Sequence, residues 1–186
     1  MNKPSFPVIV LDRDGVINQD SAEYIKSPDE WHALPGSLDA IARLHQAGFA
    51  VVVATNQSGV ARGLFSTETL TAIHQKMAEQ VTAAGGQLTR IFWCPHGPDE
   101  GCDCRKPRPG LLLQAAEFLA CGLDNMIVVG DAQRDLDAAT AVGARPILVR
   151  SGKGRNTEKA LSPDAAVEVF DNLAAVTDTL ILEVKD

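Results

Sequence analysis

The 186-residue sequence predicts an α/β fold, in which an open parallel sheet carries helices on both faces. Apolar runs rich in Val and Ile alternate with segments whose apolar residues recur at helical spacing. The apolar runs are continuous, as is typical of parallel strands buried on both faces. No repeat, low-complexity tract or polar linker divides the chain, so we expect one Rossmann-like domain over residues 1–186.

Five elements are expected in the first half of the chain. FPVIVLD is an apolar run of strand length, and SLDAIARLHQAGF has helical apolar spacing before a glycine that would end a helix. AVVVAT and LTRIFWC are short apolar runs on either side of the long helical pattern STETLTAIHQKMAEQVTAAG. The elements are a strand at 6–12, a helix at 37–49, a strand at 50–55, a helix at 66–85 and a strand at 88–94.

The second half repeats the alternation. PGLLLQAAEFLACG and RDLDAATAVG have helical spacing, NMIVVGD and RPILVR are short apolar runs, and AAVEVF is a weaker strand pattern. The elements are a helix at 109–122, a strand at 125–131, a helix at 134–143, strands at 145–150 and 165–170, and a helix from about Asn172. The connections after the first two strands leave little room for an inserted domain, so we expect a minimal cap and an open site.

Polar side chains follow three of the expected strands. In open parallel sheets, ligands bind beyond the carboxyl ends of the strands, where the strand order reverses. Asp12 and Asp14 follow the first strand, Thr55 ends the second and Asp131 ends the fourth. A plain polar turn would also explain two aspartates there, but Asp131 adds a carboxylate if the first and fourth strands are neighbours. Facing carboxylates need a shared proton or a cation, and an all-oxygen site suits Mg²⁺.

Three cysteines and a histidine lie close together between the third strand and the next helix. They are Cys94, His96, Cys102 and Cys104, with the spacing C-x-H-x5-C-x-C. Three thiolates and one imidazole form a complete tetrahedral ligand set for Zn²⁺, with no position left for water or substrate. We therefore expect a structural zinc-bound loop at about residues 94–104 that fixes Arg105 and Lys106. Free cysteines in a loop are the alternative, and Cys121 fits an ordinary core residue.

Composition and charge narrow the class of protein. The formal net charge is −7, so neither nucleic acid nor an anionic membrane is expected as a partner. No apolar run approaches the roughly 20 residues that a membrane helix needs. The apolar run near the N-terminus is too short for the core of a signal peptide. We therefore expect a soluble, cytoplasmic monomer.

Four short segments resemble, in order, the motifs of the haloacid dehalogenase superfamily of phosphatases. They are DRDGVIN, TNQSGVARG, CRKPRPG and GDAQRD, and each falls at an expected strand end or loop. The match runs from residue 8 to about residue 150. The Cys/His loop resembles a narrower branch that contains heptose bisphosphate phosphatases and histidinol-phosphate phosphatases. Within that branch, TNQSGVARG and KPRPG look more like the heptose enzymes.

The resemblance implies that Mg²⁺-dependent hydrolysis removes the 7-phosphate of a heptose 1,7-bisphosphate, in the pathway to ADP-heptose and the lipopolysaccharide core. Asp12 would attack phosphorus to form an aspartyl-phosphate, and Asp14 would act first as general acid and then as general base. Thr55 and Lys106 would hold the phosphoryl oxygens. Asp12, the Asp14 backbone carbonyl and Asp131 would hold Mg²⁺. The phosphorylated sugar would contact Arg13, Asp20, Ser21, Ala22, Glu23, Asn56, Gln57, Ser58 and Arg105.

Several alternatives stay open at this point. Asp135 either belongs to the metal shell or caps the helix that begins there. A histidinol-phosphate phosphatase is the alternative enzyme, although Arg105 suits the second phosphate of a bisphosphate better. The non-enzyme alternative is a zinc-stabilised binding protein on the same fold, which would be expected to lack one of the catalytic residues.

Other conspicuous side chains have simpler interpretations. We expect His45 and His74 to be surface or boundary residues of their helices. Trp31 and Trp93 fit core or boundary packing. Arg62, Arg108 and Arg134 are available as phosphate partners, but each on its own is more typical of a solvated charge.

Overall fold

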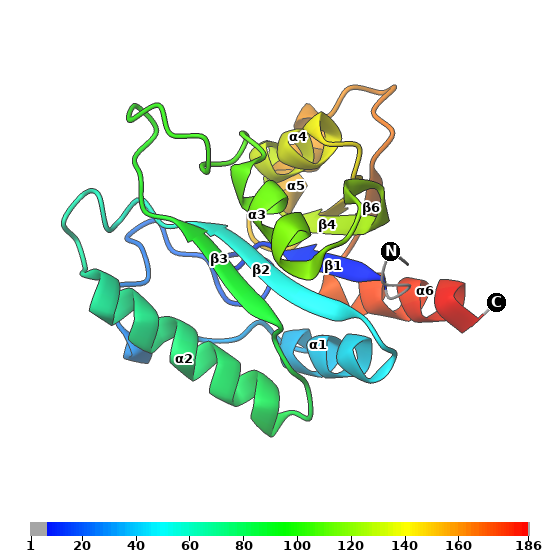
Figure 1. Cartoon of the computed structure of the whole chain (residues 1–186), viewed down its shortest axis with the longest axis horizontal. Helices are drawn as coiled ribbons and strands as arrows, with labels where there is room; N and C mark the ends of the chain where they lie inside the picture. Colours follow the sequence, from blue (N-terminus) through cyan, green and yellow to red (C-terminus); the bar gives the residue numbers. More distant parts are fainter. Residues whose placement is uncertain (1–6, 186) are drawn as a thin grey trace.

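The computed structural model describes residues 7–185, and its strands form one six-stranded parallel sheet (Figure 1). The strands are β1 Val8–Leu11, β2 Ala50–Asn56, β3 Arg90–Cys94, β4 Met126–Gly130, β5 Arg145–Val149 and β6 Glu168–Phe170. Their order across the sheet is β3-β2-β1-β4-β5-β6. The order reverses between β1 and β4, so the expected binding position lies beyond the carboxyl ends of these two strands.

Strand β1 is the central element that brings the two halves of the sheet together. Its four residues are fully buried, which explains why its apolar run is continuous rather than alternating. Leu11 is in register with Val53 of β2 and with Val129 of β4. The amide of Asp12 then donates a 2.9 Å hydrogen bond to the carbonyl of Val129. This register places Asp12 beside the end of β4.

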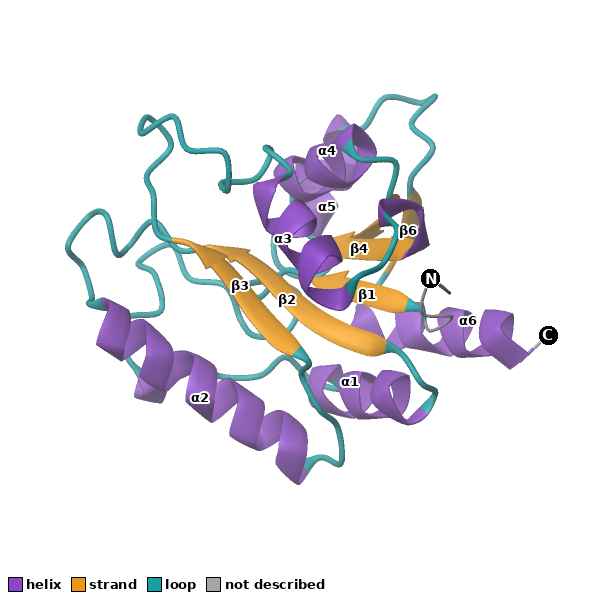
Figure 2. Ribbon diagram, in the orientation of Figure 1, coloured by secondary structure: helices purple, strands orange, loops and turns teal. Residues whose placement is uncertain are grey.

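Helices cover both faces of the sheet (Figure 2). They are α1 Ser37–Gln46, α2 Thr67–Ala83, α3 Gly110–Leu119, α4 Gln133–Ala141, α5 Gly154–Ala160 and α6 Leu173–Lys185, with 3-10 turns at Pro28–Glu30 and Leu123–Asn125. One apolar core packs the odd-numbered side of β1, including Ile9, against α1, α2 and α6. A second core packs the other side, including Val10, against α3 and α4. The three layers confirm the expected fold class.

The boundaries differ from the sequence expectations in a few places. The first strand begins at Val8, and Phe6 of the expected strand lies outside the described residues. The weak strand expected at 165–170 contains only Glu168–Phe170, the residues that pair with β5. Helix α5 was not expected, because GRNTEKA is short and lacks apolar periodicity. A Cβ at Gly154, its first residue, would collide with the carbonyl of Val149.

The connections around the site contain little secondary structure. Among the described residues, only the 3-10 turn at Pro28–Glu30 lies between β1 and α1, and the segment from 57 to 66 joins β2 to α2. These segments confirm the expectation of a minimal cap. No helix within residues 7–185 is long and apolar enough to cross a membrane.

Candidate active site

Three buried aspartates meet beyond the carboxyl ends of β1 and β4. Asp12, Asp131 and Asp135 each offer a carboxylate oxygen, and these oxygens all lie within 4.8 Å of one another. Asp12 and Asp131 were expected here from the sequence, and β1 and β4 are indeed neighbours. Asp135 comes from the first turn of α4. Three carboxylates this close require compensation by a cation or by protons.

Lys106 supplies part of that compensation. Its ammonium is 2.9 Å from Asp12 Oδ1 and 2.6 Å from Asp135 Oδ1, and the lysine is only 3 % exposed. The ammonium also donates to the carbonyl of Ala54 at 2.6 Å. The Lys106 backbone is fixed by a reciprocal pair of 3.0 Å hydrogen bonds with the Asn56 side chain. The end of β2 therefore holds the lysine between the two carboxylates.

Burial and the neighbouring charges shift the pKa values of these groups. Burial raises the pKa of Asp12 to about 6, with Lys106 opposing the rise. Burial and then Asp12 raise the pKa of Asp131 to about 7. Burial alone would lower the pKa of Lys106, but the two neighbouring carboxylates raise it above its ordinary value. The cluster therefore favours additional positive charge at neutral pH.

Asp131 has the features of a metal ligand. Its Oδ2 accepts a 2.7 Å hydrogen bond from the amide of Lys153. Its Oδ1 is buried and has no hydrogen-bond partner among the described residues. A Cβ at Gly15 or at Gly152 would collide with this carboxylate, so both positions require glycine, and both have positive φ. A buried carboxylate oxygen without a hydrogen-bond partner, beside two other carboxylates, fits Mg²⁺, which prefers oxygen ligands.

The carboxylate of Asp14 is held by its own set of donors, from Arg13, Asn18 and Gln57. Arg13 donates to both of its oxygens, at 2.8 Å and 3.0 Å from one nitrogen. Asn18 Nδ2 and Gln57 Nε2 add a hydrogen bond each, both of 2.9 Å. Burial opposes the charged form, but the Arg13 charge and these hydrogen bonds lower the pKa of Asp14 below its ordinary value. The structure therefore holds Asp14 as an ionised, fully hydrogen-bonded carboxylate.

Thr55 and Gln57 connect this carboxylate to the end of β2. Gln57 Nε2 donates to Thr55 Oγ1 at 2.9 Å as well as to Asp14. Thr55 is buried at the penultimate position of β2, one residue before Asn56, which holds Lys106. The second motif therefore orders both the lysine and the Asp14 carboxylate.

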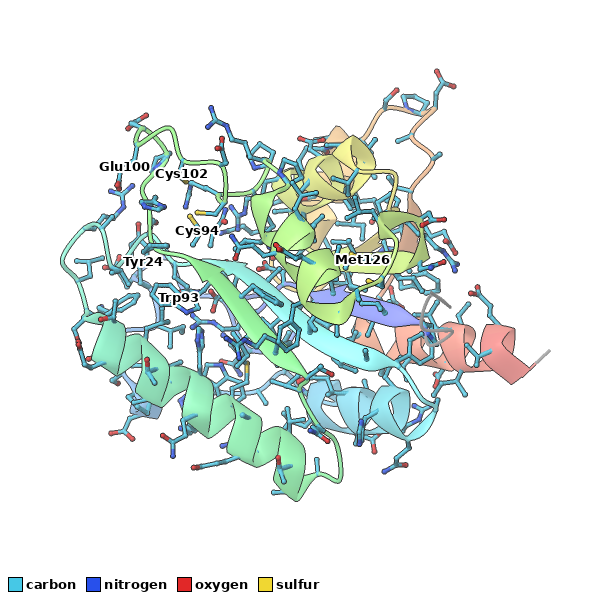
Figure 3. All side chains as sticks on the ribbon, viewed as in Figure 1. Tyr24, Trp93, Cys94, Glu100, Cys102 and Met126 are labelled. Carbon is cyan, nitrogen blue, oxygen red and sulfur yellow. The ribbon has the colours of Figure 1, made fainter. Side chains whose placement is uncertain are left out.

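A cavity of about 250 Å³ has Asp14 and Gln57 in its lining. Tyr24, labelled in Figure 3 at the carboxyl-end side of the sheet, belongs to its wall, whereas Met126 marks the start of β4. The lining contains eight of the nine expected substrate contacts, namely Arg13, Asp20, Ser21, Ala22, Asn56, Gln57, Ser58 and Arg105. Glu23 is exposed and is not part of the lining. The Arg13 guanidinium is buried and bound to Asp14.

Further cationic side chains line the same cavity, and the environment of Arg134 differs from the sequence expectation. Arg62 is exposed at the rim, as expected for a solvated charge. Arg134 is not a solvated charge, because its Nε is buried and has no hydrogen-bond partner among the described residues. Burial opposes its charge, but Asp12, Asp135 and Asp131 raise the pKa of Arg134. Lys153 pairs with Asp20 at 3.0 Å. The sequence did not indicate Lys153 as a site residue, because it precedes the unexpected helix α5.

The role expected for His74 is also wrong in part. His45 is exposed, as expected, but His74 is only 7 % exposed and contacts the Arg13 guanidinium. Of the two alternatives for Asp135, the structure shows the cap: its Oδ2 accepts the amide of Ala132 at 3.1 Å at the start of α4. Its Oδ1 pairs with Lys106, and a place in the metal shell stays a prediction. Helical spacing does not identify the partner of a side chain, so only the fold reveals these contacts.

The four expected zinc ligands converge beyond the end of β3. Cys94 and Cys102 appear there in Figure 3, with Glu100 farther along the same loop. The Sγ atoms of Cys94 and Cys102 are 3.6 Å apart, and the Cys104 Sγ is 3.0 Å from that of Cys94. His96 Nδ1 is 3.3 Å from the Cys104 Sγ. Ligand atoms at these mutual distances fit one tetrahedral centre with bonds of about 2.0–2.3 Å.

Arginine side chains hold the rest of the loop. Arg108 donates to the carbonyls of Gly101 and Cys102, at 2.6 Å and 2.8 Å. Arg105 donates to the carbonyl of His96 at 3.1 Å while also lining the cavity. The cluster therefore lies directly before Lys106 in the chain and next to it in space. Its four ligands leave no open coordination position, which separates it from the carboxylate site.

A doubly wound sheet with a buried Asp–Lys cluster at its switch point, under a minimal cap, defines a hydrolase of the haloacid dehalogenase class. A family model described as HAD-hydrolase-like matches residues 103–176. The chain is 52% identical to a D-glycero-beta-D-manno-heptose-1,7-bisphosphate 7-phosphatase of Pseudomonas putida, over 94% of this chain and 99% of that relative. A relative of the same name from Bordetella bronchiseptica is 53% identical, over 95% and 98% of the two chains.

Solved structures agree with these relatives. The D,D-heptose 1,7-bisphosphate phosphatase of B. bronchiseptica, complexed with magnesium and phosphate, superimposes with a TM-score of 0.93 at 53% identity, covering 96% of this chain and 99% of that one. The enzyme of the same name from Burkholderia thailandensis gives a TM-score of 0.75 at 43% identity, covering 94% and 98%. The chain therefore belongs to the family of heptose 1,7-bisphosphate phosphatases.

Proposed function

We propose that this chain is a Mg²⁺-dependent phosphatase that removes the 7-phosphate of D-glycero-D-manno-heptose 1,7-bisphosphate, in the formation of the ADP-heptose precursor of the lipopolysaccharide core. The observation that carries the proposal is the buried Lys106–Asp12 ion pair beside Asp131 and Asp135 at the switch point. Relatives of more than half identity carry the name of this enzyme, and one of them has been solved with magnesium and phosphate.

In the first half-reaction, a carboxylate oxygen of Asp12 attacks the phosphorus of the 7-phosphate. The new bond joins Asp12 to phosphorus, and the bond from phosphorus to the sugar oxygen breaks. Asp14, in its protonated form, gives its proton to that leaving oxygen. Thr55 and the Lys106 ammonium hold the phosphoryl oxygens as charge develops on them. Mg²⁺, when bound by Asp12, Asp131 and the Asp14 backbone carbonyl, offsets the repulsion between the Asp12 carboxylate and the phosphate.

In the second half-reaction, Asp14 takes a proton from a water molecule that attacks phosphorus. The bond between phosphorus and Asp12 breaks, and inorganic phosphate leaves. The ionised, hydrogen-bonded Asp14 of this structure has the protonation state that this base step requires. Asp14 therefore alternates between two states, and the three donors around it favour the basic one.

The ring of cations around the cavity supports a bisphosphate as the substrate. Arg105, Arg62 and Lys153 all line it. A guanidinium binds phosphate through two parallel hydrogen bonds, so Arg105 suits the phosphate that is not transferred. The amine of histidinol phosphate would instead meet this positive charge. The histidinol-phosphate alternative is therefore disfavoured by the charge of the wall.

We assign a structural role to the cluster of Cys94, His96, Cys102 and Cys104. Zn²⁺, when bound there, has four protein ligands and closes the loop that leads into Lys106. We also propose that the protein is a cytoplasmic monomer that binds no nucleic acid. The net charge of −7 supports the absence of nucleic-acid binding.

A substrate competition tests the proposed function. The purified protein is assayed with heptose 1,7-bisphosphate, histidinol phosphate and several hexose phosphates, with Mg²⁺ and with EDTA. We expect the highest kcat/KM for the heptose bisphosphate and no turnover in EDTA. A higher kcat/KM for histidinol phosphate would support the alternative enzyme. A complete lack of Mg²⁺-dependent phosphate release, including from a generic aryl phosphate, would support the binding protein.

A further inference from the structure

His74 is a buried titratable side chain that the proposed reaction does not use. It lies on the face of α2 that also carries Leu70, Ile73 and Met77, all of which are fully buried in the core. An imidazole on such a face loses its hydration and needs a polar partner. The partner is Arg13, whose NH1 lies 3.3 Å from His74 Nε2.

The chemistry of this contact fixes the state of the imidazole. A guanidinium has only donors, so Nε2 of His74 must be the acceptor, and the ring proton must lie on Nδ1. Burial, followed by the Arg13 charge, lowers the pKa of His74 to about 3. The imidazole is therefore neutral, and His74 acts as a hydrogen-bond acceptor built into the floor of the site.

Arg13 connects this acceptor to the catalytic carboxylate. The guanidinium is buried, and among the described residues its hydrogen bonds go to Asp14 and to His74. Nε and NH2 face Asp14, at 3.1 Å and 2.8 Å from Oδ1, while NH1 faces His74. The rigid, planar guanidinium is therefore held from two directions, by Asp14 through Nε and NH2 and by His74 through NH1.

We propose that His74 is a positioning residue that fixes the plane of the Arg13 guanidinium and, through it, the Asp14 carboxylate. The proposal rests on the proposed function, in which Asp14 transfers protons. Without an acceptor at position 74, NH1 would be a buried donor without a partner, which is costly. The guanidinium would rotate to find another acceptor, and Asp14 would lose its alignment with the leaving oxygen and the attacking water.

A pair of substitutions tests this role. H74L fills the apolar face but has no acceptor, whereas H74Q places a carbonyl oxygen near the position of Nε2. We expect H74L to lower kcat about tenfold, since small misplacements of a catalytic group are costly in rate. KM should stay within about twofold, and H74Q should recover most of the kcat. Wild-type kcat in H74L, or an equal loss of kcat in H74Q, would overturn the proposal.

A double-mutant cycle separates positioning from general structural support. Because His74 acts through Asp14, adding H74L to D14N should cause no further loss in single-turnover release of the aryl alcohol from an aryl phosphate. A full additional tenfold loss would mean that His74 acts elsewhere. If H74L does not fold, H74N replaces it, since its shorter amide cannot reach the position of Nε2. An inactive wild type would instead overturn the proposed function, so the two failures are distinguishable.

Discussion

The Lys106 ammonium and the Asp12 carboxylate form a buried ion pair, 2.9 Å long, between residues 94 positions apart in the sequence. Both side chains are almost inaccessible, at 3 % and 5 % exposed. The second carboxylate at Lys106, from Asp135, lies 2.6 Å away. Lys106 is therefore the cation in direct contact with these two carboxylates, and its removal would leave both of them buried without that partner.

Lys106→Met should consequently destabilise the metal-free protein by about 3 kcal/mol, the usual cost of breaking a buried ion pair. Turnover should be lost as well, because no cation would contact the transferred phosphoryl group. Urea denaturation in EDTA measures the free energy of unfolding. Lys153→Met is the matched control: Lys153 pairs with Asp20 but is 56 % exposed, so less than about 1 kcal/mol should be lost. Equal losses of unfolding free energy in the two variants would contradict a stabilising role for the Lys106–Asp12 ion pair.

Arg105→Ala should impair hydrolysis of the bisphosphate more than that of the corresponding 7-monophosphate. A lost charge-assisted hydrogen bond costs about 1.5–3 kcal/mol, or roughly ten- to a hundredfold in kcat/KM. Because Arg105 also donates to the carbonyl of His96, the control is Arg108→Ala. Arg108 holds the same loop but does not line the cavity over Asp14. Similar losses of kcat/KM on both substrates would assign Arg105 to the loop instead of the second phosphate.

Protons and Mg²⁺ should compete for the carboxylate cluster. The pKa values of Asp12 and Asp131 are raised to about 6 and about 7 in the metal-free protein. The folded state therefore holds protons that the unfolded state has released, and the metal-free protein should lose stability as pH rises from about 4 to about 7. Over the upper part of that window, Mg²⁺ should bind more tightly as these protons leave. Calorimetric titrations at several pH values measure this, and a Mg²⁺ affinity independent of pH would contradict it.

The cysteine cluster should retain about one Zn²⁺ per chain through dialysis in Mg²⁺ buffer, because four-ligand thiolate sites bind tightly. Cys104→Ser should lower the zinc content and reduce kcat up to ~10²-fold through misplacement of Lys106. Cys121→Ser is the control, since Cys121 lies outside the cluster. Metal analysis and steady-state rates are the readouts. Full turnover with zinc alone and no Mg²⁺ would mean that the zinc is catalytic.

Much of the site could be predicted from the sequence, because its residues follow the ends of strands. Asp12 and Asp131 could be placed together once β1 and β4 were taken as neighbours, and the Cys/His spacing specified its own ligand set. Arg134, Lys153 and His74 were not accessible in this way. Their roles depend on which residues far apart in the sequence the fold brings into contact with them, and local periodicity does not contain that information. The roles of the individual site residues, and the assignment of a single domain, stay predictions.

Trapping the covalent intermediate tests whether the phosphoryl group passes through Asp12. In Asp14→Asn the amide can neither protonate the leaving oxygen nor activate water. With an aryl phosphate as substrate, whose leaving group needs no proton, the aspartyl-phosphate should therefore form and then accumulate. The variant is mixed with substrate and Mg²⁺, quenched in acid within the first turnover, digested and mapped by mass spectrometry. We predict a phosphoryl group on Asp12, and none when Asp12→Asn is combined with Asp14→Asn. A phosphoryl group on another residue, or near-normal steady-state turnover of Asp12→Asn, would contradict the account.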